Sequence, residues 1–291
     1  MRLAWITDPH FNFLPPAGTA KFAKYVRRLT QADAIVMTGD IAECPSLAFN
    51  LVLFASKVEI PVYFVLGNHD FYNGSLEKGR LIAQVLHDSQ AVKNLSWLNA
   101  AGVVELTPEI ALVGHGGWYD ARSGDPEGSN VIMNDFKVIE EFRDKERYGH
   151  IEKCREVAKQ MAEEARPNLV AAARKYKQVF FATHIPPFRE SCFYRDRISD
   201  KNWLPWFTNL TFGAMLADVA SLFPEVKFTV LCGHTHSPGE YKHFENLTVY
   251  TGHSDYGNPQ VSKIFSLGLE AQGEAESPAD APLGGSSGPL G

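Results

Sequence analysis

The sequence predicts a mixed α/β sandwich, in which partly parallel sheets are covered by helices. Short apolar runs alternate with helical patterns in the first third of the chain, which is typical of parallel strands joined by helices. Further apolar runs come later with shorter connections, and these indicate an antiparallel part. Several runs end directly in Asp, Asn or His, so we expect the chemistry of the protein at the strand ends.

The amino-terminal part is predicted to contain three strands, each followed by a helix. Apolar runs rich in β-formers predict the strands, at 3–7, 34–37 and 62–66. Apolar residues at helical spacing predict the helices, over 19–29, 46–57 and 75–87. Two further runs separated by Thr-Pro-Glu predict a hairpin, at 103–106 and 110–113.

The rest of the chain divides into a charged segment, a second set of strands and a tail. Residues 119–177 are poor in strands and helical in pattern, and Pro167 is expected to break or restart the helix there. Strands are predicted again at 179–182, 228–232, 247–250 and 261–265. Residues 271–291 lack apolar side chains to bury, which predicts a disordered tail after one domain over 1–270.

Composition narrows the classes of function and the compartment. The net charge is −6, from 28 basic and 34 acidic residues, and this argues against nonspecific binding to a nucleic-acid backbone. The four cysteines are scattered without a CxxC motif and are typical of reduced thiols. Neither a leader peptide nor an apolar run of membrane-spanning length is recognisable. We therefore expect a cytoplasmic protein that does not bind a membrane.

Five predicted strands end in residues that can bind a metal. These residues are Asp8, His10, Asp40, Asn68, His184, His234 and His236. A single histidine at a strand end is most often structural. Five strand ends that all carry residues able to bind a metal favour one common site. Two of the pairs, Asp8 with His10 and His234 with His236, have a spacing that lets both side chains chelate one ion. Nitrogen and oxygen donors without a thiolate suit Mn, Fe, Zn, Co or Ni.

The order of these motifs resembles that of the calcineurin-like metallophosphoesterase superfamily. The motifs are Asp-x-His, Gly-Asp, Gly-Asn-His-Asp, a strand-end His in Thr-His-Ile-Pro-Pro, and Gly-His-Thr-His, and they span 8–236. The resemblance implies a four-layer α/β/β/α sandwich with mixed sheets and a dinuclear metal site. It implies one metal held by Asp8, His10, Asp40 and His236. It implies the other held by Asp40, Asn68, His184 and His234, with Asp40 bridging the two.

Such a site predicts the hydrolysis of phosphate esters. Two cations neutralise charge on the phosphoryl oxygens and lower the pKa of a bridging water, whose hydroxide attacks phosphorus in line. His69 neighbours a predicted ligand without being one, which makes it the candidate to protonate the leaving alkoxide. Asp70 either orients His69 and raises its pKa or only holds the turn.

Candidates for substrate binding come from other strand ends and from one connecting segment. His115 is expected to lie behind the metal ligands, and His253 follows the strand after Gly-His-Thr-His. The segment 188–210 interleaves arginines with aromatic residues that can pair with phosphate and stack on a planar group, among them Arg189, Arg195, Trp203 and Trp206. We interpret it as a candidate lid, with a packed connecting loop as the alternative. The helical segment 119–177 is a possible second wall, cover or homodimer surface.

Three functions compete on the sequence alone. The leading one is hydrolysis of a small phosphodiester or phosphomonoester, with a nucleotide-like ester carrying a planar group as the favoured substrate. A nuclease of the same superfamily is disfavoured because the chain is acidic and lacks a basic stripe. A catalytically silent scaffold with the same fold is disfavoured because it has no reason to keep so many polar residues at one point.

Overall fold

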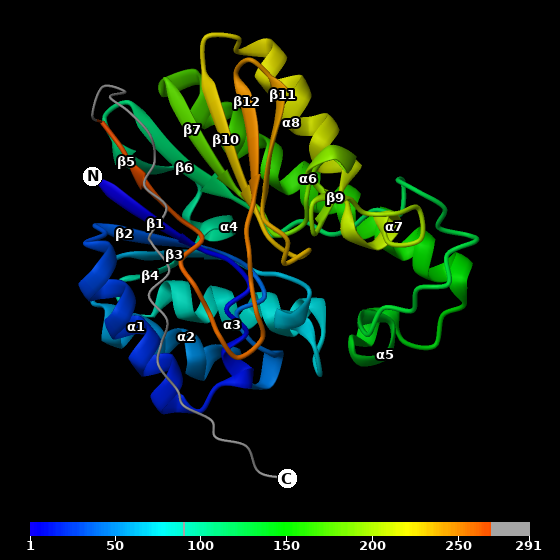
Figure 1. Ribbon diagram of the computed structural model, residues 1–291, viewed down its shortest axis with the longest axis horizontal. Helices are drawn as coiled ribbons and strands as arrows, with labels where there is room; N and C mark the ends of the chain where they lie inside the picture. Colours follow the sequence, from blue (N-terminus) through cyan, green and yellow to red (C-terminus); the bar gives the residue numbers. More distant parts are fainter. Residues whose placement is uncertain (90, 269–291) are drawn as a thin grey trace.

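The computed structural model describes residues 1–89 and 91–268, and the predicted tail at 271–291 lies outside the described residues. Two β-sheets lie face to face between layers of helices (Figure 1). The first sheet contains, in spatial order, β13 (Lys263–Ser266), β1 (Arg2–Ile6), β2 (Ala34–Thr38), β3 (Val62–Val65) and β4 (Leu95–Trp97). The second contains β11 (Gly239–Phe244), β12 (Leu247–Thr251), β10 (Lys227–Cys232), β7 (Gln178–Ala182), β6 (Ile110–Gly114) and β5 (Val104–Thr107). The predicted α/β sandwich with mixed sheets is confirmed.

Strand direction follows the connections. In the first sheet β1, β2, β3 and β4 run parallel, and β13 is antiparallel to β1. In the second sheet β6, β7, β10 and β12 run parallel, and antiparallel pairing is found at its two edges, between β5 and β6 and between β11 and β12. We expected the later strands to form an antiparallel part, and this is right only for the two edges of the second sheet. Helices supply the crossovers between parallel strands except from β10 to β12, where the chain forms β11, and the helix before β10 was not predicted.

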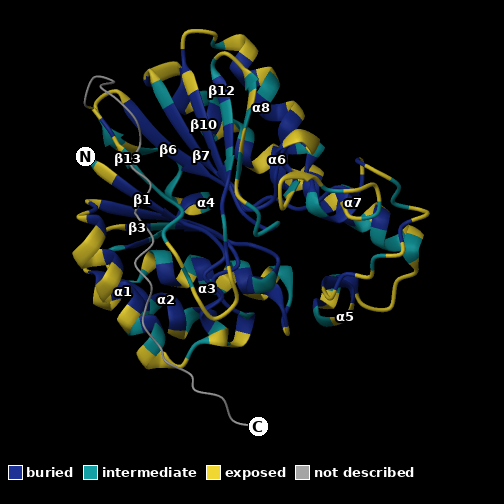
Figure 2. Ribbon diagram, viewed as in Figure 1, coloured by how far each residue is buried: buried dark blue, intermediate teal, exposed yellow. Residues whose placement is uncertain are grey.

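Helices cover the outer face of each sheet. The first sheet is covered by α1 (Pro16–Thr30), α2 (Cys44–Val58) and α3 (Leu76–Asp88), and the second by α6 (Arg147–Lys175) and α8 (Leu210–Leu222). The short helix α4 (Leu98–Ala101) follows β4 and contacts both β3 and β6. In Figure 2 the buried residues follow the strands and the inward faces of the helices.

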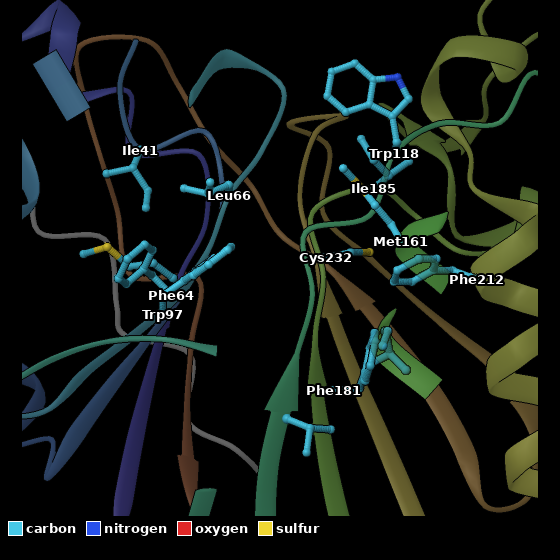
Figure 3. Packing of buried hydrophobic residues seen from close by; sticks show 14 of the residues in the cluster. Ile41, Phe64, Leu66, Trp97, Trp118, Met161, Phe181, Ile185, Phe212 and Cys232 are labelled. Atoms are coloured by element: carbon cyan, nitrogen blue, oxygen red, sulfur yellow. The ribbon is translucent and has the colours of Figure 1, made fainter. Parts of the chain in front are cut away.

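Alternate residues of the strands supply two cores. In β1, Leu3 and Trp5 join a cluster between the sheets, whereas Ala4 and Ile6 join a larger cluster under the helices. Figure 3 shows part of the larger cluster, with Phe64 beside one sheet and Phe181 beside the other. Because both faces of the central strands are buried, these strands consist almost wholly of apolar residues. This frame fixes the strand ends that carry the site.

The segment 119–177 is only partly helical. It contains the short α5 (Asp135–Val138), the 3₁₀ turn η3 (Glu140–Phe142) and the long α6, whereas 119–134 forms no helix. Helix α6 continues through Pro167, contrary to prediction. Burial of Leu169, Ala172 and Ala173 beyond the proline offsets the cost of the lost hydrogen bond, about 3 kcal/mol. Among the described helices, none is both long and apolar enough to cross a membrane.

Candidate metal centre

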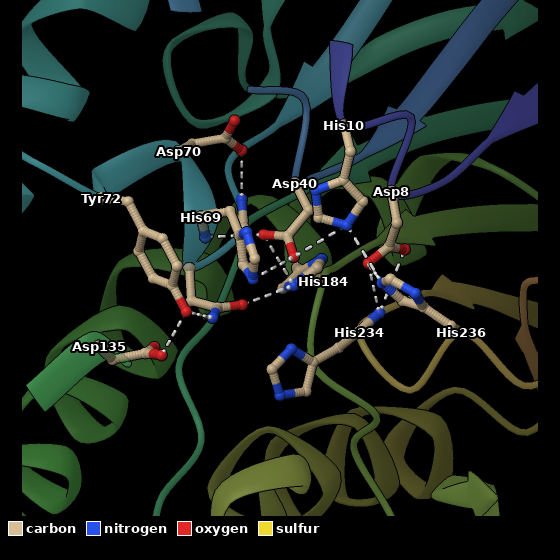
Figure 4. A network of polar contacts seen from close by, with 12 residues as sticks. Asp8, His10, Asp40, His69, Asp70, Tyr72, Asp135, His184, His234 and His236 are labelled. Atoms are coloured by element: carbon tan, nitrogen blue, oxygen red, sulfur yellow. Dashed lines mark hydrogen bonds and ion pairs between the residues drawn. The ribbon is translucent and has the colours of Figure 1, made fainter. Parts of the chain in front are cut away.

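The seven predicted ligands come together at the carboxyl ends of strands from both sheets (Figure 4). Asp8 and His10 follow β1, Asp40 follows β2, and Asn68 follows β3. On the second sheet, His184 follows β7, and His234 and His236 follow β10. Strands far apart in the sequence therefore deliver polar side chains to one edge of the sandwich, where α/β proteins bind ligands.

Four side chains form the first donor group, namely Asp8, His10, Asp40 and His236. Their donor atoms all lie within 4.8 Å of one another. The two imidazoles approach most closely, with His10 Nε2 3.1 Å from His236 Nε2. His236 Nε2 also lies 3.4 Å from Asp8 Oδ1, and His10 Nε2 lies 3.9 Å from Asp40 Oδ2. Two nitrogens and two carboxylates that converge in this way can hold one transition-metal ion.

Asp40 also belongs to a second donor group, with His184 and His234. His184 Nε2 lies 3.2 Å from Asp40 Oδ1 and 3.0 Å from Asn68 Oδ1. The Asn68 amide oxygen is thus beside the second group and adds a neutral donor to it. Because Asp40 turns one oxygen to each group, it is placed to bridge two ions.

Hydrogen bonds at the far side of two imidazoles fix which nitrogen is free for a metal. His184 Nδ1 lies 2.9 Å from the Thr38 carbonyl oxygen, and His234 Nε2 lies 3.0 Å from the Trp206 carbonyl oxygen. A carbonyl only accepts, so these nitrogens carry the protons and donate. In the neutral form of each ring the opposite nitrogen then carries the lone pair, which is the arrangement that metal-binding histidines adopt. The residues present therefore fit a metal centre.

The backbone at the donor groups is strained. Asp8, His10, Asp40, His234 and His236 have φ values of 47°, 43°, 50°, 68° and 55°, in the left-handed region that L-residues rarely adopt. Such conformations persist where the surroundings impose them, and they gather at functional sites. Here the Asp8 carboxylate accepts from the His234 backbone N–H at 3.0 Å, and Asp40 Oδ1 accepts from the His69 N–H at 2.8 Å.

Glycine is required where the loops cross. A Cβ at Gly233 would collide with the Asp8 carboxylate and with the Thr7 hydroxyl. Gly39 has a φ of 86°, and a Cβ there would lie 2.8 Å from His184 Nδ1. Side chains at either position would displace a ligand, so the glycines allow the close approach of the donors.

Charge at the site keeps its carboxylates ionised. Burial by itself raises the pKa of Asp8, but the charges of His184 and His236 and a hydrogen bond from His236 lower it to about 2. The same balance, with His184 and His69 as the main positive partners, holds the pKa of Asp40 well below its usual value. Both acids are therefore available as anionic ligands at neutral pH.

Burial separates the histidines into neutral and charged ones in the metal-free protein. It lowers the pKa of His10 to about 4 and that of His234 to about 3, so these two imidazoles are neutral. Burial also lowers the pKa of His184, but the charges of Asp40 and Asp8 reverse this and raise it to about 9. Burial lowers the pKa of His236 too, but the hydrogen bond and the charge of Asp8 outweigh burial and raise that pKa above its usual value.

His69 lies at the edge of the centre and is reachable from solvent. Its side chain is 17% exposed, and its Nε2 atom lies 3.8 Å from Asp40 Oδ2. The ring stacks on Tyr72, with centroids 4.1 Å apart and an interplanar angle of 22°. This position beside the shared carboxylate suits a group that gives a proton to a leaving oxygen.

The Asp70 carboxylate is hydrogen-bonded to the backbone of two loops. It accepts hydrogen bonds from the backbone N–H groups of Ile41, Ala42 and Gly67, at 2.8, 2.9 and 2.8 Å. These bonds tie the loop after β2 to the loop after β3. Of the two roles that the sequence left open, the structure favours the one that holds the turn.

Two predicted pocket histidines have structural partners. His115 Nε2 lies 3.0 Å from Glu164 Oε2, and the residue lines a cavity of about 530 Å³ between α3 and α6. It is thus engaged away from the two donor groups. His253 lies beside the first group, where its Nδ1 atom is 3.1 Å from the His236 carbonyl oxygen.

The candidate lid is buried near its two ends and exposed between them, over 194–198. Trp206, in α7 (Leu204–Phe207), is fully buried and donates from Nε1 to Ser129 Oγ at 3.0 Å. Trp203 is 47% exposed and packs edge-on against Phe207, whose ring lies 4.3 Å from that of His234. Arg189 lies in the turn η4 (Arg189–Ser191) and is exposed. Exposed Arg195 joins β8 (Phe193–Tyr194) to β9 (Arg197–Ile198), over the ring of Tyr194.

The structure adds residues that the sequence analysis missed. Tyr72 and Asp135 form a hydrogen-bonded pair behind Asn68 and His69, and Tyr256 places its ring 4.5 Å from that of His10. Asp135 carries no motif, because it reaches the site through the fold alone. Tyr256 follows His253 in the loop after β12, so its place after a strand end was a usable signal.

Comparison with known proteins bears on the family and on the fold. The calcineurin-like phosphoesterase family model matches residues 1–238. Phosphopantetheinyl hydrolase (PptH) from Mycobacterium tuberculosis is similar in structure, with a TM-score of 0.63, 16% identity, and coverage of 87% of this chain and 89% of that one. A dimetal phosphatase from Danio rerio gives a TM-score of 0.52 with 15% identity, and each chain is covered to 87%. No curated protein sequence matches the chain.

Proposed function

Since the chain belongs to the calcineurin-like phosphoesterase family, we propose that it is a dinuclear-metal-dependent hydrolase of small phosphate esters. The observation that carries the proposal is the position of Asp40, whose two carboxylate oxygens face two separate donor groups. In this proposal Asp8, His10, Asp40 and His236 hold one ion. Asp40, Asn68, His184 and His234 hold the other.

In this proposal the side chains hold the metals in place and donate a proton to the leaving group, and the metals supply positive charge. Bound divalent ions neutralise charge on a phosphoryl group and make water acidic enough to react near neutral pH. Asn68 ligates through a neutral amide, which leaves more positive charge for the substrate. His69 is the proposed proton donor to the leaving oxygen, since it is partly exposed and 3.8 Å from the shared carboxylate.

A small substrate suits the charge of the protein. The net charge of −6 is unfavourable for a nucleic-acid backbone, which favours a compact monoester or diester over a nuclease substrate. The Mycobacterium tuberculosis neighbour is named for hydrolysis of a phosphopantetheinyl group, and at 16% identity it supports the fold alone. A phosphopantetheinyl ester is nevertheless a reasonable member of a substrate panel. The four buried free cysteines support a reducing compartment such as the cytoplasm.

The test combines metal analysis with a substrate screen. Purified protein is loaded with Mn, Fe, Zn, Co or Ni, and its metal content is compared with its activity on phosphate monoesters and diesters. We expect two tightly bound ions per chain, loss of activity with a chelator, and loss of most of both ions in Asp40→Ala. The exposed Asp88 serves as a matched control, because Asp88→Ala should keep both ions. Full activity with at most one tightly bound ion per chain would contradict the proposed dinuclear centre.

A further inference from the structure

Two half-exposed aromatic rings lie directly beside the first donor group. Phe13 and Tyr256 are each 54% exposed, although both are large and largely apolar. The Tyr256 ring lies 4.5 Å from His10 and 5.0 Å from His236, measured between centroids. The Phe13 ring lies 4.9 Å from Tyr256 and 6.0 Å from His10. Together Phe13 and Tyr256 form an aromatic wall that continues the surface of the donor group.

The loop that carries Tyr256 is fastened to the loops that carry the proposed ligands. Buried Ser254 donates from Oγ to the Asp8 carbonyl oxygen at 2.5 Å. His253 Nδ1 lies 3.1 Å from the His236 carbonyl oxygen. Phe13 lies in the turn η1 (Phe11–Phe13), which begins directly after His10. Both rings are thus held at a fixed place relative to the donors, which is what a binding surface needs to discriminate between ligands.

The chemistry of the wall identifies what it binds. Exposed ring faces gain most from another planar ring, which can stack on them or meet them edge-on. The Tyr256 side chain is a phenol, which carries no charge at neutral pH. The wall therefore offers stacking and apolar contact and no charge, so it suits the organic part of an ester better than its phosphate.

We propose that Phe13 and Tyr256 bind the organic group of the substrate, and that this group contains a planar ring. The inference rests on the proposed phosphoesterase function and names the class of ester that it acts on. It moves substrate discrimination from the segment 188–210 to the loops after β1 and β12. Buried Trp206 cannot stack on a ligand, whereas the two rings of the wall are open to solvent and adjoin the donors.

Binding of two phosphonates to the metal-loaded protein tests the inference. Naphthylphosphonate and methylphosphonate carry the same anionic head and are not hydrolysed as esters, so calorimetry measures their affinities without turnover. We expect the wild-type protein to prefer naphthylphosphonate by about 10-fold or more, as stacking on aromatic side chains gives. The double variant Phe13→Ala/Tyr256→Ala should bring this preference close to one and leave the affinity for methylphosphonate within about 2-fold.

A matched control separates the wall from any exposed aromatic pair. Phe49 and Tyr148 are 56% and 68% exposed and lie in α2 and α6, so Phe49→Ala/Tyr148→Ala should keep the preference. Equal loss in both double variants, or an unchanged preference in Phe13→Ala/Tyr256→Ala, would overturn the inference and leave the metal centre intact. If neither phosphonate nor inorganic phosphate binds to protein that holds its metals, the proposed function fails, and the inference fails with it.

Discussion

The Tyr72 hydroxyl donates a 2.8 Å hydrogen bond to Asp135 Oδ2, which joins the loop after β3 to the first residue of α5. The Tyr72 oxygen in turn accepts from Asn68 Nδ2 at 3.4 Å. Because the amide nitrogen of Asn68 faces Tyr72, its oxygen faces His184 Nε2, at 3.0 Å. The pair thereby sets the amide orientation that the second donor group needs.

Removal of this hydroxyl should weaken the second metal selectively. Tyr72→Phe keeps the ring that stacks on His69 and removes the acceptor for Asn68. Loss of an outer partner of a metal ligand typically costs about 10- to 100-fold in affinity or activity. We expect the number of ions kept after dialysis against a weak chelator to fall from two toward one. Tyr176→Phe is the control, since Tyr176 is also buried and bonded to a carboxylate, that of Glu105.

A tight second ion in Tyr72→Phe would contradict the orienting role. Asp135→Ala gives an independent check, because it frees the Tyr72 hydroxyl to donate to Asn68 and so disfavours the observed amide orientation. It should therefore weaken the same ion and spare the ion of the first group.

Metal binding should release protons near neutral pH. His184, whose pKa is about 9 in the metal-free protein, carries a proton at pH 7 that a metal must displace, and the pKa of His236 is raised as well. His10 and His234, with pKa values of about 4 and 3, are already neutral and release none. Metal affinity should therefore rise with pH from neutrality through the pKa of His184, about 9, and level off about one pH unit above it.

Calorimetry in buffers of different ionisation enthalpy counts these protons. We expect at least one proton released per chain at pH 7, and the release from His184 to fall by half near pH 9, which is its pKa. Release of no proton at pH 7 would mean that the carboxylates do not hold the charge of His184, and the assigned electrostatics would be wrong.

Local sequence order was enough to predict which side chains meet at the candidate site. Each donor directly follows a strand, and parallel strands bring their carboxyl ends to one edge. The same logic could not find the groups that position the ligands. The acceptors for His184 and His234 are the backbone carbonyls of Thr38 and Trp206. Because every residue has a backbone carbonyl, no sequence motif indicates which carbonyl accepts the bond.

Fold prediction was limited for a related reason. Periodicity predicted the long buried strands but missed β4 and β11, which are short or alternate in exposure at an edge. Pro167 indicated a break in α6 because the rule is local, whereas the helix is held by burial of the residues after it. Asp135 lies 63 residues from Tyr72, and only the folded chain brings them together.

His69 should act on the leaving group alone. His69→Ala is expected to keep both metals and to lose about 10²- to 10⁴-fold in rate on alkyl phosphoesters. The loss should shrink for a nitrophenyl ester, because nitrophenolate leaves without a proton. Rate constants on the two ester types, with metal content measured alongside, check this. An equal loss on both would exclude general-acid catalysis.

Trp206 should contribute to stability and Trp203 should not. Trp206 is fully buried, bonds to Ser129 and lies under the guanidinium of Arg147, 5.3 Å from the ring centroid. Trp206→Ala therefore should lower the free energy of unfolding by about 3–5 kcal/mol. Trp203 is 47% exposed, and Trp203→Ala should change it by no more than about 0.5 kcal/mol.

Denaturant titration of both variants measures the difference, and Trp206→Phe provides a milder change should Trp206→Ala not fold. The phenylalanine variant keeps most of the buried ring and loses the bond to Ser129, so its loss should be smaller. Because the Trp206 carbonyl accepts from His234, loosening of α7 should also weaken the second ion in proportion to the lost stability. If Trp203→Ala destabilised the protein more than Trp206→Ala, the assignment of Trp206 as the stabilising residue of the segment 188–210 would be wrong.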